Sequence, residues 1–182
     1  EYDKGFWSSV EVSKKINKKF SVSLEEEFRL RNNLKTTDKF MTTLGLDYKI
    51  NKFFDVGISD CFINYYHPGN KKHDYKNYWE NKNRLNLYGE GDYTLGRFSF
   101  SLRERLQSTY TFLDSISNQE INPELILRSK LSVSYNIPKI PVEPYASVEN
   151  FLPLNGSYKY STEEMRFAFG LKYSINKKLA LK

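Results

Sequence analysis

The chain has 182 residues, with 28 Lys and Arg against 22 Asp and Glu, and a net charge of +6. This length suits one domain. Charged residues make up 27% of the chain and no run of about 20 apolar residues occurs, which excludes a helical membrane protein. Aromatic residues make up 16%, which argues against disorder. The single cysteine, Cys61, excludes an internal disulfide framework and a Cys-rich metal site.

Apolar residues recur at every second position from end to end, which predicts β-strands with two unlike faces. The segment 20–31 shows the pattern well, because Val22, Leu24 and Phe28 alternate with polar residues. No segment has a convincing helical period. In chain order we expect strands over 6–15, 20–31, 40–50, 54–62, 85–93, 98–107, 125–135, 142–151 and 165–173, with a tenth starting at Leu179.

The connections between these strands fall into two kinds. A short turn with Asn or Gly recurs at 16–20, 48–53, 93–98, 135–139 and 173–179. Asn and Gly tolerate the positive φ of tight hairpins. Longer polar connections are expected at 32–38, 67–81, 113–123 and 153–160. Short and long connections therefore alternate in the predicted fold.

Sequential antiparallel strands close most simply into an up-and-down barrel, because closure removes exposed sheet edges. We predict an all-β, up-and-down antiparallel transmembrane β-barrel over 1–182, a single domain with ten strands visible and ten to twelve in the full chain. Strands of about 10 residues suit a tilted membrane crossing. Aromatic residues near both strand ends and unequal connections also favour an outer-membrane barrel. A soluble lipid-binding barrel with apolar faces inward is the second alternative.

Two features depart from this pattern. Glu26 and Glu104 fall on the apolar faces of their strands, where a carboxylate facing lipid is costly, and a β-bulge that turned them inward would remove the conflict. The first strand also starts on the side of the long connections, whereas the termini of such barrels usually lie on the short-turn side.

Several short motifs resemble one known family, an uncharacterised outer-membrane barrel family of the Bacteroidota, the domain-of-unknown-function family "twenty-four ninety". They are Phe6-Trp7, Lys14 to Phe20, Glu25 to Arg29, Leu46 to Lys52, Arg103 to Gln107 and Pro144 to Phe151. The resemblance covers most of the chain and implies a barrel in the outer membrane. Family members usually continue for another strand or two, so it also implies a chain that is incomplete at its C-terminus. It supplies no functional residue.

If the apolar faces point to lipid, the polar faces line a lumen. The charged residues expected there are Glu25, Glu27, Arg29, Arg31, Arg84, Glu90, Asp92, Arg103, Arg105, Arg128, Glu149 and Arg166. Arg and Glu in a narrow interior favour interlocked ion pairs that fill it. The alternative is a narrow pore, in which the excess of bases favours anions.

No pattern indicates catalysis, a metal or a cofactor. His67 and His73 lie in one polar stretch, away from any nucleophile on a strand, and no G-x-S-x-G motif occurs. Lysines at the turns suit solvent or anionic head groups better than nucleic acid. We therefore expect a non-enzymatic outer-membrane protein with a structural or accessory role, whose partners are outer-membrane lipid and other envelope proteins.

One aromatic group is a candidate for contact with a partner protein. Tyr65, Tyr66, Tyr78 and Trp79 flank the predicted connection at 67–81. Exposed aromatic residues often anchor interfaces. The simpler interpretation is an aromatic girdle at the membrane interface.

Overall fold

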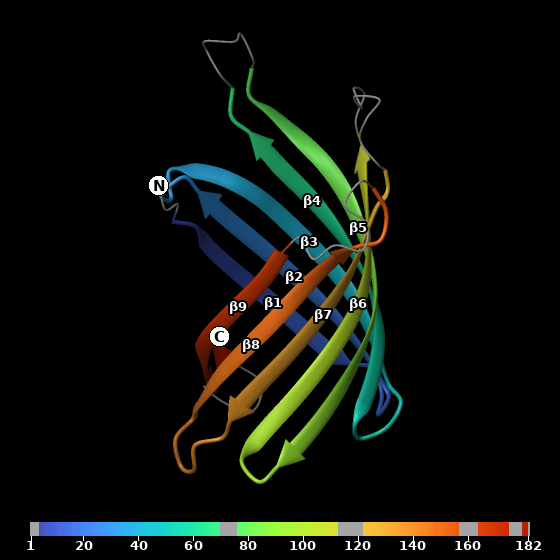
Figure 1. The fold of residues 1–182 in the computed structure, drawn as a ribbon, viewed down its shortest axis with the longest axis vertical. Helices are drawn as coiled ribbons and strands as arrows, with labels where there is room; N and C mark the ends of the chain where they lie inside the picture. Colours follow the sequence, from blue (N-terminus) through green and yellow to red (C-terminus); the bar gives the residue numbers. More distant parts are fainter. Residues whose placement is uncertain (1–3, 70–75, 113–121, 157–163, 175–179, 182) are drawn as a thin grey trace. The chain divides into compact units, whose positions relative to one another are not determined.

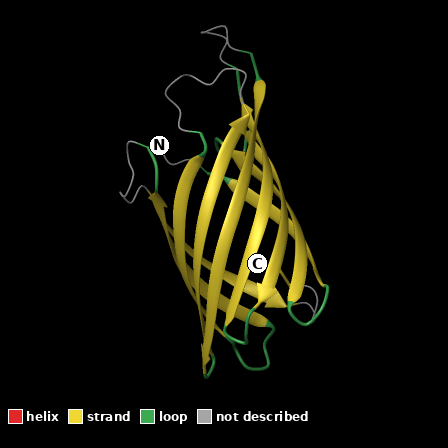
Figure 2. Ribbon diagram, turned by 90° about the vertical axis from the view of Figure 1, so that its right-hand side faces the viewer, coloured by secondary structure: helices red, strands yellow, loops and turns green. Residues whose placement is uncertain are grey.

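The computed structural model describes residues 4–69, 76–112, 122–156, 164–174 and 180–181. Within these residues every regular element is a strand (Figures 1 and 2). The strands are β1 (Phe6–Lys15), β2 (Phe20–Arg31), β3 (Thr36–Lys49), β4 (Phe54–His67), β5 (Tyr78–Leu95), β6 (Phe98–Phe112), β7 (Glu124–Tyr135), β8 (Val142–Pro153), β9 (Glu164–Ser174) and β10 (Ala180–Leu181).

The ten strands form one sheet in the order β1 to β10, so each strand pairs with its neighbours in the chain. Figure 1 shows this order as a continuous progression of colour across the labelled strands. The pairs β1–β2, β2–β3, β7–β8, β8–β9 and β9–β10 are antiparallel. The predicted all-β, up-and-down antiparallel architecture is confirmed. The described residues include no helix long and apolar enough to cross a membrane.

The chain divides into two compact units. Unit 1 comprises residues 1–48, 57–87 and 107–124, and unit 2 comprises residues 49–56, 88–106 and 125–182. In unit 1, β1 starts opposite the end of β2, where Phe6 pairs with Leu30. In unit 2, β8 is the central strand between β7 and β9. The start of β1 beside the β2–β3 connection agrees with the position expected from the sequence.

Two of the predicted repeat turns have the same hydrogen bonds. Asn17 Oδ1 accepts the backbone N–H groups of Lys19 and Phe20 at 2.8 and 2.9 Å. Asn51 Oδ1 accepts those of Phe53 and Phe54 at 2.8 and 3.0 Å. An Asn side chain that bonds its own backbone a few residues on stabilises a tight turn. At these two turns the recurring Asn therefore reflects one turn geometry.

The predicted long connection at 32–38 is wrong. The structure has a tight turn over Asn32 to Lys35 instead, and β3 begins at Thr36. Asn32, Asn33 and Leu34 all have positive φ, and the backbone N–H of Lys35 donates to the Asn32 carbonyl at 3.2 Å. Asn adopts this conformation readily. The two adjacent Asn residues close the turn early, so short and long connections do not alternate from the start of the chain.

Several strands are longer than predicted. β4 continues to His67, β5 begins at Tyr78 instead of Leu85, and β6 continues to Phe112. The additional residues carry polar side chains on both faces, so the apolar alternation fades although the backbone pairing continues. The hydrophobic pattern therefore marks the middle of each strand rather than its ends.

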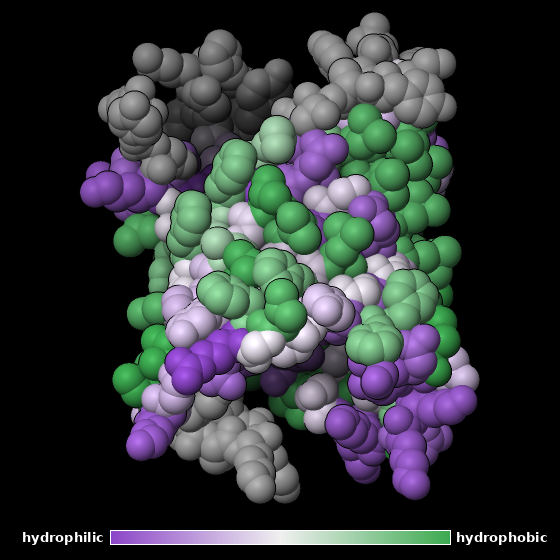
Figure 3. All heavy atoms as spheres, turned by 60° about the horizontal axis from the view of Figure 1, so that its bottom comes forward, coloured by the Kyte–Doolittle hydropathy of each residue, from purple (hydrophilic) through white to green (hydrophobic). Residues whose placement is uncertain are grey.

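The apolar face of the sheet is exposed. Phe167, Phe169 and Leu171 of β9 are 65, 81 and 64% exposed. Figure 3 shows broad areas of hydrophobic side chains at the surface. Among the described apolar residues only Met41, Cys61 and Ile63 are classed as buried, and all three belong to the other, charged face of unit 1. Most of the large apolar side chains therefore have no protein core around them.

The bulge that would turn Glu26 inward does not occur at that residue. Glu26 pairs in register with Thr42, and its carboxylate accepts the Thr42 hydroxyl at 2.9 Å. Glu104 likewise accepts the Ser129 hydroxyl at 2.6 Å. Both acids stay exposed on the apolar face. A hydroxyl on the adjacent strand lowers the cost of placing a carboxylate there.

The β2–β3 register does shift, between Arg29 and Leu30 of β2. Arg29 pairs with Lys39 and Leu30 with Thr37, so Asp38 is the extra residue of a β-bulge. Bulges change the direction in which nearby side chains point. Here the bulge brings the Asp38 carboxylate within 3.6 Å of Arg31.

The turn hydrogen bonds predict the effect of Asn51→Ala. The variant leaves two backbone N–H groups without their side-chain acceptor, so we expect the free energy of unfolding to fall by about 1 kcal/mol. Asn51→Asp keeps an oxygen acceptor and should stay within about 0.5 kcal/mol of the wild type. Equilibrium unfolding in urea measures both values. Equal midpoints for the Ala variant and the wild type would contradict this role of the turn.

Candidate functional site

The charged face of unit 2 holds an Arg–Glu pair that links β6 to β5. Arg103 Nε donates to Glu90 Oε2 at 2.7 Å, and a second guanidinium nitrogen donates to the same oxygen. The Ser101 hydroxyl donates to the other Glu90 oxygen at 2.5 Å. Both carboxylate oxygens of Glu90 are thus occupied. Charge-assisted bonds of this kind are stronger than neutral ones.

A second pair joins β7 to β8 in the same unit. Arg128 donates to Glu149 Oε1 through Nε at 3.0 Å and through Nη2 at 2.7 Å. The two side chains are 14 and 11% exposed, which makes this one of the best-shielded ion pairs in the described residues. The guanidinium carbon of Arg128 also lies 4.6 Å from the centre of the Phe151 ring, and that of Arg166 lies 5.0 Å from it. Arg stacks well on aromatic faces.

Arg105 differs from its neighbours. Its Nε is buried and has no hydrogen-bond acceptor within the described residues. The guanidinium carbon instead lies 5.7 Å from the ring centre of Tyr88, and that of Arg103 lies 5.4 Å from the same ring. A cation over an aromatic face is stabilised without a carboxylate.

Unit 1 has its own charged contacts. Arg29 pairs with Glu27 and lies 4.2 Å from the centre of the Trp7 ring. Arg31 donates to the Tyr65 hydroxyl at 2.9 Å and to the Tyr66 carbonyl at 2.8 Å, which ties β2 to β4. Arg84 donates to the Thr109 hydroxyl at 3.3 Å.

Six of the twelve charged residues predicted for the lumen form ion pairs with one another. These pairs are Glu27–Arg29, Glu90–Arg103 and Arg128–Glu149. Arg31 and Arg166 pair with Asp38 and Glu164, which were not predicted as site residues. Glu25, Asp92 and Arg105 belong to no ion pair among the described residues.

Asp38 and Glu164 were missed for a common reason. Asp38 lies in the polar segment taken for a long connection, and Glu164 precedes the predicted start of β9. The β-branched Thr36 and Thr37 beside Asp38 favour a strand. They are the signal that could have extended β3.

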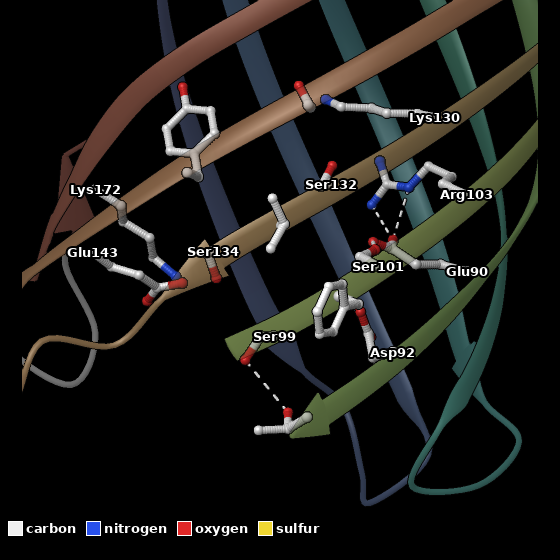
Figure 4. Close-up of a pocket in the computed structure, with 15 residues that line it drawn as sticks. Glu90, Asp92, Ser99, Ser101, Arg103, Lys130, Ser132, Ser134, Glu143 and Lys172 are labelled. Carbon is white, nitrogen blue, oxygen red and sulfur yellow. Dashed lines mark hydrogen bonds and ion pairs between the residues drawn. The ribbon is translucent and has the colours of Figure 1, made fainter. Parts of the chain in front are cut away.

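A cavity of about 400 Å³ lies against the charged face of unit 2 (Figure 4). Its lining residues come from β5 to β9 and are Glu90, Asp92, Thr94, Ser99, Phe100, Ser101, Arg103, Lys130, Ser132, Val133, Ser134, Glu143, Tyr145, Ser147 and Lys172. Three of the predicted residues, Glu90, Asp92 and Arg103, are among them. The small serines that surround them were missed, because serine alternating with apolar residues also suits any solvent-facing strand.

The four aromatic residues predicted as a partner contact lie in two separate groups. Tyr66 and Trp79 contact each other at 5.0 Å between ring centres, and Trp79 lies 5.9 Å from Phe40. Tyr65 and Tyr78 instead flank His67, at 4.9 and 4.5 Å between ring centres. These ring contacts therefore do not join the four residues into a single surface.

The described residues include no cluster of three or more His, Cys, Asp or Glu that could hold a metal ion. His67 contacts Glu80 at 3.1 Å, and Lys82 also contacts Glu80 at 3.2 Å.

The family described as "Protein of unknown function (DUF2490)" matches residues 4–182. The chain belongs to this family. The resemblance seen in the short motifs is thereby confirmed for the family as such. No curated protein and no solved structure matches the chain.

The contrast between two Arg–Glu pairs gives a prediction for stability. Arg128→Ala leaves the shielded Glu149 carboxylate without its donor, so the free energy of unfolding should fall by about 2 kcal/mol. Arg166→Ala is the matched control, because its Glu164 partner is 54% exposed, and should cost about 1 kcal/mol or less. Chemical unfolding measures both variants. If both variants lost the same free energy of unfolding, shielding from solvent would not determine how much an ion pair contributes to stability.

Proposed function

We propose that this chain is an outer-membrane β-barrel protein of a Gram-negative cell envelope. In this proposal the sheet closes into a barrel whose apolar face contacts lipid and whose charged face points inward. The observation that carries it is the exposure of the apolar face, for which Phe169 at 81% is the extreme case. Large exposed apolar areas mark a surface that contacts something other than water.

Aromatic contacts on the apolar face of unit 1 support the membrane placement. Near one end of the strands, Phe28 contacts Phe40 at 4.8 Å, and the Phe40–Trp79 and Trp79–Tyr66 contacts continue the group across β2 to β5. Near the other end, Phe20 contacts Tyr48 at 4.8 Å. Aromatic belts at two levels are typical of outer-membrane barrels.

The spacing of the two aromatic levels suits a bilayer. Phe20 and Phe28 are separated along β2 by roughly 26 Å at the usual rise of a strand. At a tilt of about 40° this becomes roughly 20 Å along the membrane normal, comparable with the apolar band of about 25 Å in such barrels.

The proposed role is structural or accessory and involves no reaction. The Arg–Glu pairs of the charged face support it. Arg103 forms an ion pair with Glu90, and Arg128 forms one with Glu149, and each pair joins adjacent strands. Such pairs suit the filled interior of a small barrel. Lipid of the outer membrane and other envelope proteins are the partners in this proposal.

A narrow anion-leaning pore is the second candidate. Two observations favour it: the buried Nε of Arg105 has no acceptor within the described part of the chain, and a cavity of about 400 Å³ lies along the charged face of unit 2. Arg105→Ala separates the two roles. In a pore it should lower the anion preference measured in planar bilayers, whereas in a filled barrel no conductance appears in either the wild type or the variant.

Membrane partition tests the main proposal directly. The chain is expressed with an export signal, outer membranes are isolated, and electrophoretic migration is compared with and without boiling. We expect the protein in the outer-membrane fraction, with a shift on boiling. A soluble monomer would overturn the proposal and favour the barrel with apolar faces inward and a bound lipid.

A substitution on β9 makes the same test quantitative. If Phe169 faces lipid, Phe169→Arg should make folding into phospholipid vesicles less favourable by about 2–4 kcal/mol. Phe169→Leu is the control and should fold almost as well as the wild type. If the side chain faced water instead, the Arg variant would be neutral. Folding efficiency into vesicles, read from the boiling shift, measures the difference.

A further inference from the structure

The cavity of unit 2 has a lining that differs from an ordinary small-molecule site. Such sites have volumes of about 300–1,000 Å³ and are mostly apolar, with a few polar groups. This cavity has a comparable volume, about 400 Å³, but its apolar side chains are Phe100 and Val133. The shape admits a small molecule, whereas the lining suits a hydrophilic one.

Hydroxyl groups dominate the lining. They belong to Thr94, Ser99, Ser101, Ser132, Ser134, Tyr145 and Ser147. A hydroxyl both donates and accepts hydrogen bonds and rotates to suit its partner. A surface of hydroxyls therefore matches a ligand whose own groups both donate and accept, as the hydroxyls of a sugar do.

The charges of the lining balance. Three acids, Glu90, Asp92 and Glu143, face three bases, Arg103, Lys130 and Lys172. Glu90 and Arg103 also use their charges on each other. The cavity thus has no formal excess of either sign with which to favour an anion or a cation.

An acid and a base remain available at one side of the cavity. Glu143 of β8 and Lys172 of β9 are direct partners in the strand register. Neither forms an ion pair in the described part of the chain. Figure 4 shows both side chains on the same side of the cavity as Ser134. Together they offer a ligand strong acceptors and strong donors close to one another.

Tyr145 supplies an aromatic surface held in place by a glycine. It pairs with Gly170 across β8 and β9. A Cβ added at Gly170 would come within 2.6 Å of the Tyr145 hydroxyl and 2.7 Å of two ring atoms. The end of the ring therefore occupies the space above the glycine. An aromatic ring fixed before binding loses little freedom when a ligand packs on it.

We propose that this cavity binds a neutral saccharide of roughly one or two sugar rings. The C–H face of a sugar carries partial positive charge and packs on the negative face of an aromatic ring, here that of Tyr145. The sugar hydroxyls bond the serine hydroxyls, Glu143 and Lys172. This site lies beyond the structural role proposed above and does not depend on where in the cell the protein resides.

Titration calorimetry on the full chain, folded in a detergent without a sugar head group, tests the proposal. The probes are the neutral disaccharides maltose, lactose and N,N′-diacetylchitobiose, with inorganic phosphate and glycylglycine as an anion and a zwitterion. We expect saturable binding of at least one saccharide and none of phosphate or glycylglycine. If no saccharide binds, or if only the anion or the zwitterion binds, the proposal is overturned.

Variants at Tyr145 locate the binding. Tyr145→Ala should weaken it about tenfold, whereas Tyr145→Phe keeps the ring and should stay within about threefold. Tyr110→Ala is the control, because Tyr110 is exposed and does not line the cavity. Equal affinity of the Tyr145→Ala variant and the wild type would place the saccharide elsewhere and overturn the assignment.

Gly170→Ala gives an independent arm if Tyr145→Ala fails to fold. The added methyl displaces the end of the Tyr145 ring without removing it, and the backbone at Gly170 does not require a glycine conformation. We expect weaker saccharide binding with an unchanged far-ultraviolet circular dichroism spectrum, which shows that the sheet still forms. Wild-type affinity in this variant would show that the position of the ring does not matter, which contradicts the proposal.

Discussion

The exposed apolar face is the constraint on which the rest of the structure depends. A strand places successive side chains on opposite faces. In this chain nearly every strand puts its apolar set on one face, and large residues such as Leu44 and Phe167 stay 60 and 65% exposed. A soluble domain gains most of its stability by burying such residues. Here that gain must come from whatever covers the apolar face, which is the physical basis for proposing lipid.

The charged face then has to stabilise the sheet by other means. Most of its arginines contact carboxylates or aromatic faces, and several do both. Arg128 bonds Glu149 and lies over Phe151, while Arg103 bonds Glu90 and lies over Tyr88. A planar guanidinium can bond in its plane and stack through its faces at the same time, which the ammonium group of lysine cannot do. Arginine is therefore better suited than lysine to make both contacts at positions 103 and 128.

The sequence predicts the strands better than it predicts the contacts between their side chains. The alternation of apolar and polar residues is local, so it placed the strands and assigned Arg103 and Glu90 to one face. The pairing of these two residues depends on register between strands, which alternation alone does not determine. The clearest case is Asp38, which contacts Arg31 through a bulge that inserts an extra residue into β3. No sequence period signals such an insertion, and the polar neighbours of Asp38 predict a loop.

The polar residues on the apolar face follow a rule of their own. Glu26 accepts a hydrogen bond from Thr42, and Glu104 accepts one from Ser129. Asp60 accepts from Asn83 at 2.8 Å, and the Asn64 amide donates to Asn81 Oδ1 at 2.7 Å. Each of these bonds joins neighbouring strands on the same face. A polar group in lipid is costly mainly when it is unsatisfied.

Their position along the strands adds to this argument. Glu26 and Thr42 are each two residues from Phe28 and Phe40, and Asn64 and Asn81 are each two residues from Tyr66 and Trp79. These four polar residues therefore adjoin the aromatic contacts at one end of unit 1. The cost of a charged group in a barrel wall falls toward the membrane interface. Glu26, bonded across strands and next to an aromatic belt, is thus compatible with a lipid-facing surface.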